Sequence, residues 1–122
     1  MKRAILLVDH GSRRAEANAM LERVAELLAQ RLPEAIVRCA HMDLADPDIA
    51  QGIAACAAAG AREIVVHPYF LGPGNHTTND IPRLVEDAAA SHPELRIRVS
   101  EPLGIHPKLV DVIIDRVDEA SS

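Results

Sequence analysis

Aromatic side chains are almost absent from this 122-residue sequence, which has one tyrosine, one phenylalanine and no tryptophan. A protein that binds nucleic acid by stacking bases needs exposed rings, so this mode of binding is disfavoured. Hydrophobic residues nevertheless make up 48% of the chain, enough for a real core. That core must be aliphatic, which favours helices packed closely on a sheet of Val, Ile and Leu.

Three further features are missing. The formal net charge of −5 provides no general basic field for polyanions, so we expect no nucleic-acid partner. No run approaches the roughly 18 apolar residues of a membrane span, and residues 1–8 are too short for a signal peptide, which predicts a cytoplasmic protein without membrane contact. No disulfide-framework spacing is present, so we expect Cys39 and Cys56 to be reduced core thiols.

The length fits one domain, residues 1–122, in which short apolar runs alternate with helical patterns. The predicted strands are 4–8, 35–40, 63–67 and 95–99. A helical pattern follows each of them, so the order is βαβαβαβα. We therefore predict an α/β fold, a single three-layer sandwich with a four-stranded parallel sheet in the order 2-1-3-4, covered on both faces.

Local signals predict where the helices begin. Ser12 is the expected N-cap of the first helix and Pro47 opens the second. The segment 68–76 is rich in Gly and Pro and is expected to be a loop. Asp80 would then cap the third helix, with Pro82 in its first turn. The fourth helix is expected to begin at Pro107 and carries an apolar stripe.

Polar side chains follow three of the predicted strands. His10 follows the first strand, His41 and Asp43 follow the second, and the loop containing His76 follows the third. Ligands of parallel sheets bind at the carboxyl ends of the strands, so these groups are expected to converge. Imidazole is a good ligand for divalent Co, Fe, Ni and Zn. Two imidazoles make an open site, unlike a closed structural zinc site with four ligands.

Two longer motifs carry a resemblance to a known family. VDHGSR at 8–13 and HPYFLGPGNHTTNDIP at 67–82, followed by PLGIHP at 102–107, resemble the short form of the class II tetrapyrrole chelatases, the sirohydrochlorin cobaltochelatases and ferrochelatases. The resemblance covers nearly the whole chain. It implies a chelatase-like domain and insertion of Co²⁺ or Fe²⁺, with Ni²⁺ as a further candidate, into a sirohydrochlorin-type ring. It implies no organic cofactor, because the metal is a substrate.

The resemblance also implies roles for individual residues. His10 and His76 would bind the metal, with Asp43, where relatives commonly carry Glu, as an auxiliary base. Longer relatives contain two such domains facing across a cleft, so a chain of this length is expected to form a homodimer. The residues expected to contact the tetrapyrrole are Arg13 and Arg14 through its carboxylates, Tyr69, Phe70 and Leu71 through its apolar face, and Gly74 and Asn75 in the histidine loop.

Other functions fit parts of the pattern. A non-catalytic carrier of metal or tetrapyrrole would use the same two histidines and stays open as an alternative. A flavodoxin-like or receiver-type domain shares the architecture, but one Asp ends the first strand where an acidic cluster would be needed, and no phosphate-binding glycine loop follows. A histidine phosphatase is disfavoured because Asp9, and not an arginine, precedes His10.

Overall fold

The structure, a computed structural model, describes residues 2–72 and 75–121, and only the backbone of residues 75–78 is considered. The elements in chain order are β1 (Arg3–Asp9), α1 (Ala15–Arg31), β2 (Ile36–His41), α2 (Ile49–Ala58), β3 (Glu63–Pro68), α3 (Asn75–Ala89), β4 (Arg96–Val99) and α4 (Pro107–Ser121). Strands and helices alternate as predicted. None of the described helices is both long and apolar enough to cross a bilayer.

All neighbouring strands run parallel, in the order β2-β1-β3-β4, which confirms the predicted topology. The register places Asp9 beside His41 and Val8 beside Pro68. The carboxyl ends of β1, β2 and β3 therefore meet at one edge of the sheet. The segments that follow these strands carry the polar groups singled out by the sequence.

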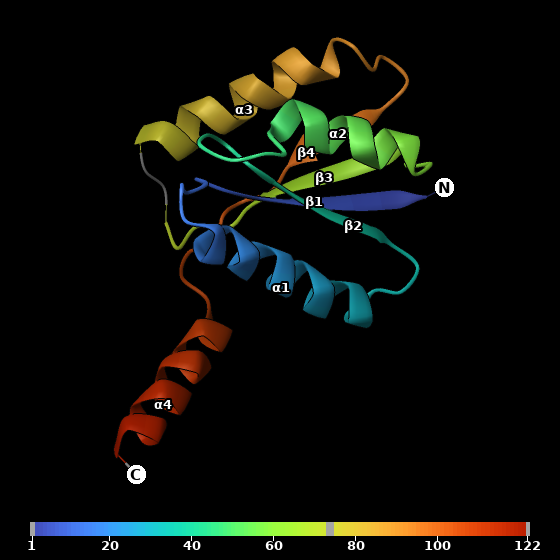
Figure 1. Ribbon diagram of the computed structural model, residues 1–122. Coiled ribbons are helices and arrows are strands. Elements are labelled where there is room, and N and C mark those ends of the chain that lie inside the picture. The colour runs from blue at the N-terminus through green and yellow to red at the C-terminus, as the bar shows by residue number, and fades with distance from the viewer. Residues whose placement is uncertain (1, 73–74, 122) are drawn as a thin grey trace.

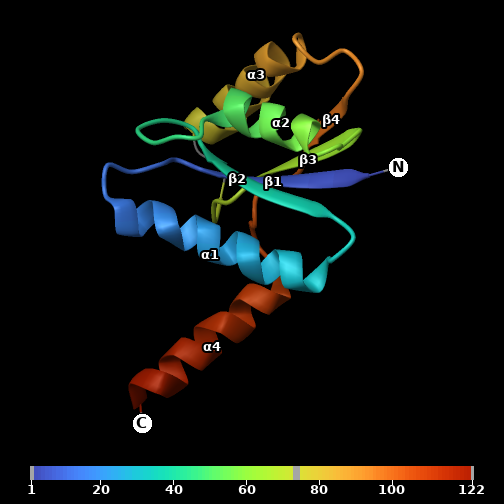
Figure 2. The same ribbon diagram turned by 45° about the vertical axis from the view of Figure 1, so that its right-hand side comes forward.

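Three layers are visible in Figures 1 and 2: α2 and α3 lie over one face of the sheet, and α1 lies over the other. The predicted three-layer sandwich is thus confirmed, with one correction. Helix α4 projects away from the sheet in both views and has no buried residue. An amphipathic stripe predicts that a helix has a face to bury, but it does not specify which surface covers that face.

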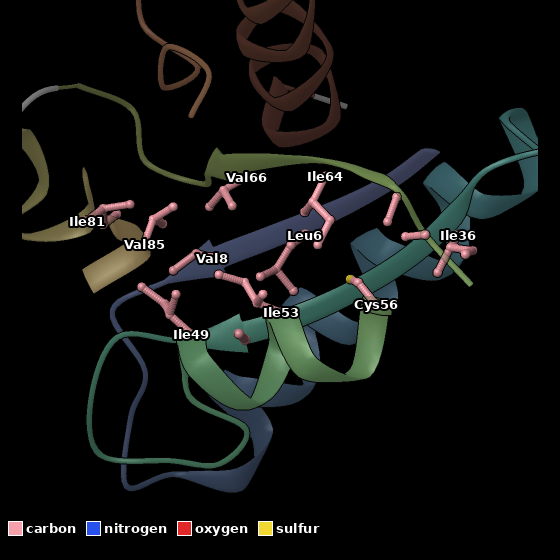
Figure 3. Close-up of a cluster of buried hydrophobic side chains, with 13 residues drawn as sticks. Leu6, Val8, Ile36, Ile49, Ile53, Cys56, Ile64, Val66, Ile81 and Val85 are labelled. Carbon is pink, nitrogen blue, oxygen red and sulfur yellow. The ribbon is translucent and has the colours of Figure 1, made fainter. Parts of the chain in front are cut away.

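The main core lies between the sheet and the pair α2 and α3, as Figure 3 shows. Alternate residues of β1 and β3 point into it, and from the helices Ile53 and Ile81 are fully buried. Helix α2 approaches closely because Gly52 lacks a side chain. A Cβ at this position would lie 2.8 Å from Leu6 Cδ1 and 3.0 Å from Ala40 Cβ. The glycine is therefore needed for this close packing.

Three helices begin where the sequence does not predict. Helix α2 begins at Ile49 and not at Pro47, because Asp48 is its N-cap: the Asp48 Oδ1 accepts a hydrogen bond from the Gln51 N–H at 2.8 Å.

Helix α1 begins at Ala15 with Arg14 as its N-cap, and the Ser12 hydroxyl accepts from the Arg14 N–H at 3.0 Å. The Ser12 backbone is bonded to Asn18: the Ser12 N–H donates to Asn18 Oδ1 at 2.9 Å, and Asn18 Nδ2 donates to the Ser12 carbonyl at 2.8 Å. Helix α3 begins at Asn75, so Pro82 lies in its interior and not in its first turn. The predicted loop is thus shorter than expected.

The two cysteines are unpaired thiols, as predicted. Cys56 is buried in α2, and this burial raises the pKa of its thiol to about 11. Cys39 in β2 is half-buried, and burial followed by the nearby charges of Glu22 and Asp9 raises its pKa as well. Both thiols are therefore protonated at neutral pH and are weak metal ligands and nucleophiles.

Candidate functional site

His10 lies directly after β1, exposed on the rim where the strand ends. The chain turns sharply at Gly11, whose φ of +86° favours glycine. A Cβ on Gly11 would lie 1.9 Å from the Asp43 carbonyl oxygen, so the turn and the segment after β2 are in direct contact. Asp43 N–H also donates to the His10 carbonyl at 3.1 Å. This close approach requires glycine next to His10.

The aromatic segment after β3 reaches His10 through one residue. The Phe70 ring meets the His10 ring edge to face, with centroids 4.4 Å apart and planes at 69°. Tyr69 instead packs with Leu7 and Leu21 on the α1 side. Leu71 is exposed and lines a separate apolar cavity of about 690 Å³ at the beginning of α4. The three predicted wall residues therefore lie in three different environments.

A cavity of about 430 Å³ opens beside His10, between the ends of β1 and β2 and the first half of α3. It is lined by His10, Gly11, Met42, Asp43, Leu44, Asp80, Arg83 and Leu84. The structure thus brings together two of the predicted site residues, His10 and Asp43. The Asp43 carboxylate is exposed, and its Oδ1 accepts a hydrogen bond from the Leu44 N–H at 2.8 Å.

The third predicted catalytic residue, His76, lies in the first turn of α3, four residues before the cavity-lining Asp80. Its side chain and that of Asn75 lie outside what the structure describes, and Gly74 is outside the described residues altogether. The sequence places His76 in a loop, and the structure corrects this to a helix. A residue at a helix start is held by backbone hydrogen bonds that a loop residue lacks.

The cationic residue at the cavity is one that sequence reasoning missed. Arg83 lines the cavity and pairs with Asp80 at 2.8 Å, with its side chain 69% exposed. The predicted pair Arg13 and Arg14 is exposed and lies outside the cavity lining, with Arg14 3.2 Å from Glu16. The signal that could have found Arg83 is its spacing from His76, because residues seven apart share one helix face.

Two further histidines are held by hydrogen bonds. His41 is buried at the end of β2, and its Nδ1 lies 2.5 Å from Asp9 Oδ1. His67 Nδ1 lies 2.8 Å from Ser100 Oγ in a half-buried position. Burial lowers the pKa of His67, partly offset by a hydrogen bond with the Glu101 backbone. Neither residue lines the cavity beside His10.

Across the described side chains, no three His, Cys, Asp or Glu residues gather closely enough to hold a metal ion. At the cavity beside His10, the described side chains offer one imidazole, from His10, and two carboxylates, from Asp43 and from Asp80, which pairs with Arg83. Nitrogen and oxygen donors of this kind suit a divalent first-row metal and leave most of its coordination positions open. This donor set does not resemble a closed structural zinc site.

Comparison with known proteins agrees with this geometry. The family model CbiX matches residues 4–120. The chain is 42% identical over 97% of its length to the chloroplastic sirohydrochlorin ferrochelatase of Arabidopsis thaliana, and 34% identical over 93% to the sirohydrochlorin cobaltochelatase of Methanocaldococcus jannaschii. Among solved structures, it matches the cobalt complex of the sirohydrochlorin chelatase SirB from Bacillus subtilis subspecies spizizenii with a TM-score of 0.89 and 32% identity.

The relatives differ in length. The chain spans 52% of the Arabidopsis protein and 51% of SirB, but 96% of the Methanocaldococcus protein. It also covers 96% of the CbiX protein of Marinobacter aquaeolei VT8, with a TM-score of 0.83 at 31% identity. The match over nearly the whole chain, to the family model and to relatives of its own length, shows that this protein belongs to the CbiX family.

Proposed function

We propose that this chain inserts Co²⁺ or Fe²⁺ into sirohydrochlorin, as an enzyme of cobalamin or siroheme biosynthesis, with Ni²⁺ as a third ion to test. The observation that carries the proposal is the position of His10. Its imidazole is exposed at the end of β1, lies against Phe70, and shares a cavity with Asp43. An accessible imidazole beside an acidic group and an aromatic ring suits metal delivery to a flat macrocycle.

His76 would supply the second metal ligand. Residues four apart lie on the same side of a helix, so the position of His76 in α3 shares a side with Asp80, which lines the cavity. We expect the His76 imidazole to approach the metal from α3 while His10 approaches from β1. This pair would leave most coordination positions of the metal open for the incoming pyrrole nitrogens.

The reaction exchanges protons for the metal. Sirohydrochlorin gives up its pyrrole N–H protons, and the metal forms bonds to the nitrogens in their place, so no oxidant, reductant or organic cofactor is required. A neutral His10 or His76 can accept one proton as it releases the metal. The exposed Asp43 carboxylate can accept the other and pass it to solvent. Binding energy from the periphery of the ring would bend the macrocycle toward the metal.

Arginine side chains would bind the peripheral carboxylates of the ring. Arg83 is already at the cavity, and Arg13 and Arg14 lie exposed at the end of the turn that follows His10. Guanidinium groups pair well with carboxylates because they offer several donors in a plane. Asn75, Gly74 and the aromatic segment 69–71 would complete the contact with the ring.

A second copy of the chain would complete the cleft. Helix α4 exposes an apolar stripe formed by Val110, Ile113, Ile114 and Val117, each at least 51% exposed. Its other side carries Asp111, Asp115 and Asp118. An unpaired apolar stripe of this length is unstable in water, and longer relatives supply a further half-chain of similar size. We therefore infer a homodimer in which each α4 packs on its partner.

The sheet offers a surface for that packing. On the α1 side, Val65 in β3 is only half-buried, and the neighbouring Arg98 in β4 is exposed. Figure 1 shows α1 beneath β1 and β2, with α4 extended away from the sheet. We propose that the stripe of α4 from one chain packs on this part of the sheet of the other, with a two-fold axis that lets each chain supply both surfaces. A cytoplasmic location stays a prediction.

Anaerobic absorbance spectroscopy tests the activity. Purified protein is mixed with sirohydrochlorin and Co²⁺ or Fe²⁺, and the conversion of the free-ring spectrum is followed beside a protein-free blank. We expect His76→Ala and His10→Ala to lose about a hundredfold or more in rate while remaining folded, since each removes a metal ligand. Faster insertion of Co²⁺ would favour cobalamin biosynthesis, and faster insertion of Fe²⁺ would favour siroheme biosynthesis.

The matched control is His92→Ala. His92 follows α3 at the other end of the sheet, where its Nδ1 lies 3.7 Å from Glu94 Oε1. This variant is expected to turn over at the wild-type rate. Wild-type turnover in a folded His76→Ala protein contradicts the mechanism. A spectrum that shifts on binding, with insertion no faster than the blank, favours the carrier function instead.

A further inference from the structure

His41 is the one buried polar residue among those the structure describes, with 2% of its surface exposed. The reaction proposed above does not use it. Burying an imidazole costs free energy unless its polar atoms are paired, so its partners indicate its role. His41 ends β2, directly beside the end of β1 in the sheet register.

Its partner is the side chain that precedes His10. His41 Nδ1 lies 2.5 Å from Asp9 Oδ1, and the same oxygen accepts a hydrogen bond from the Gly11 N–H at 3.0 Å. One carboxylate oxygen therefore bridges the buried imidazole of β2 and the residue after His10. The bond between His41 and Asp9 is short and largely shielded from water, which strengthens it.

The backbone on both sides of His10 is tied to the same segment. Met42 N–H donates to the Asp9 carbonyl at 2.9 Å, and Asp43 N–H donates to the His10 carbonyl at 3.1 Å. A Cβ on Gly11 would lie 3.0 Å from His41 Cβ, so the turn rests directly on His41. Movement of the His41 side chain would therefore displace the turn that carries His10.

We propose that His41 is a positioning residue: through Asp9 it fixes the turn around His10 and so holds the His10 imidazole ready for the metal. The proposal rests on the proposed role of His10 as a metal ligand. It explains why a polar residue occupies a core position. Groups hydrogen-bonded directly to a metal ligand typically contribute about tenfold to a hundredfold in metal affinity. His41 and Asp9 act on the backbone beside His10 and not on its ring, so we expect the lower end of this range, about tenfold.

The test measures binding of Co²⁺ alone, without tetrapyrrole, by titration calorimetry. His41→Leu removes the donor and is expected to weaken Co²⁺ binding about tenfold. His41→Asn keeps a donor nitrogen near the position of Nδ1 and is expected to recover most of the affinity. The control is His67→Leu, which removes another strand-end imidazole, bonded to Ser100 Oγ at 2.8 Å, and should leave the affinity unchanged.

A second variant keeps the test decisive if His41→Leu does not fold. Asp9→Asn retains an oxygen that accepts from Gly11 but loses the charged partner of His41, and is expected to weaken Co²⁺ binding several-fold. In ¹H–¹⁵N spectra of the metal-free protein, the ring signals of His10 should shift in Asp9→Asn and stay in place in His67→Leu. A pure effect on stability would not produce this pattern.

The outcomes separate this inference from the proposed function. Weaker Co²⁺ binding in His41→Leu with recovery in His41→Asn supports it, even if the wild type binds Co²⁺ without inserting it into sirohydrochlorin. Wild-type Co²⁺ affinity in folded His41→Leu, or in Asp9→Asn, overturns it while His10→Ala still weakens binding. If His10→Ala leaves Co²⁺ binding unchanged, the role of His10 and this inference both fail.

Discussion

The two faces of the sheet are covered to different degrees. Toward α2 and α3, Leu6, Val8, Ile64 and Val66 are almost completely buried, and Gly52 brings α2 close to the strands. Toward α1, the corresponding residues of β1 and β3 are partly exposed apart from Leu7, as Ile5, Val65 and His67 illustrate. The face toward α2 and α3 therefore provides most of the buried core, whereas the face toward α1 keeps accessible apolar surface.

The largest expected effect comes from a matched pair of Ile→Ala substitutions. Ile53→Ala, in the closely packed face, removes a side chain with no exposed surface and should lower the free energy of unfolding by about 2–5 kcal/mol. Ile113→Ala, on α4, starts from a side chain that is 60% exposed and should cost less than about 0.5 kcal/mol. Urea unfolding gives the free energy of unfolding of both variants, extrapolated to infinite dilution of the protein so that association does not contribute. Equal losses of this free energy in the two variants would contradict the difference between the closely packed face and α4.

The next effect concerns association. Ile113→Asp places a charge in the apolar stripe of α4 and is expected to weaken the dimer at least about tenfold, because a carboxylate cannot be buried unpaired. Lys108→Glu changes the charge of α4 by more, but on its polar side, and should leave the dimer intact. Sedimentation equilibrium measures both. A wild-type protein that is monomeric at all concentrations would contradict the proposed dimer, in which each α4 packs on the partner chain.

A smaller effect would show from which side the substrate approaches. Arg83 lies on α3, over the closely packed face, whereas Arg14 lies at the beginning of α1. Arg83→Gln should raise KM for sirohydrochlorin about threefold to fivefold with little change in kcat, since an exposed ion pair contributes up to about 1 kcal/mol. The control Arg23→Gln removes a similar exposed i,i+3 pair, with Glu26 at 3.0 Å, far from the cavity.

The KM of Arg14→Gln for sirohydrochlorin, compared with that of Arg83→Gln, shows over which face of the sheet the carboxylates bind. A larger rise in KM for Arg14→Gln than for Arg83→Gln would place the carboxylates of the ring over the α1 side. If neither substitution changes the KM for sirohydrochlorin, these arginines do not bind the carboxylates of the ring.

The smallest expected effect is a pH dependence of the free energy of unfolding, caused by His67 on the face of the sheet toward α1. Burial lowers the pKa of His67 in the folded protein, so the unfolded chain binds a proton more readily. The contribution of His67 to the free energy of unfolding is therefore fully present above the ordinary histidine pKa of about 6.5. It is lost as the pH falls from there through the lowered pKa of the folded protein. His67→Gln should flatten the decline in urea midpoint between pH 7 and pH 5. An unchanged decline would assign it to other groups.

Much of this organisation could be predicted from the sequence. Apolar runs that alternate with helical patterns, and right-handed crossovers, are sufficient to predict a parallel sheet covered by helices. The pattern does not determine the order of the strands, although the order 2-1-3-4 that we chose agrees with the structure. The same topology correctly brings His10 and Asp43 to one cavity, because both directly follow parallel strands. These predictions depend on local pattern and chain direction, which the sequence contains.

The remaining differences have physical causes. The Gly and Pro residues at 72–74 conceal the beginning of α3, and Pro82 is tolerated inside a helix that packs on the core. The stripe of α4 predicts a buried face, but a second chain can bury it as well as its own sheet can. Arg83 was missed because its seven-residue spacing from His76 has a meaning only on a helix, and the sequence predicts a loop at His76.

X-ray absorption spectroscopy of the protein with one equivalent of Co²⁺ would show directly whether His10 and His76 bind the metal. We expect two imidazole ligands in the wild type, one in either His10→Ala or His76→Ala, and none in the double variant. An unchanged imidazole count in the single variants would contradict the claim that these two histidines hold the metal for insertion.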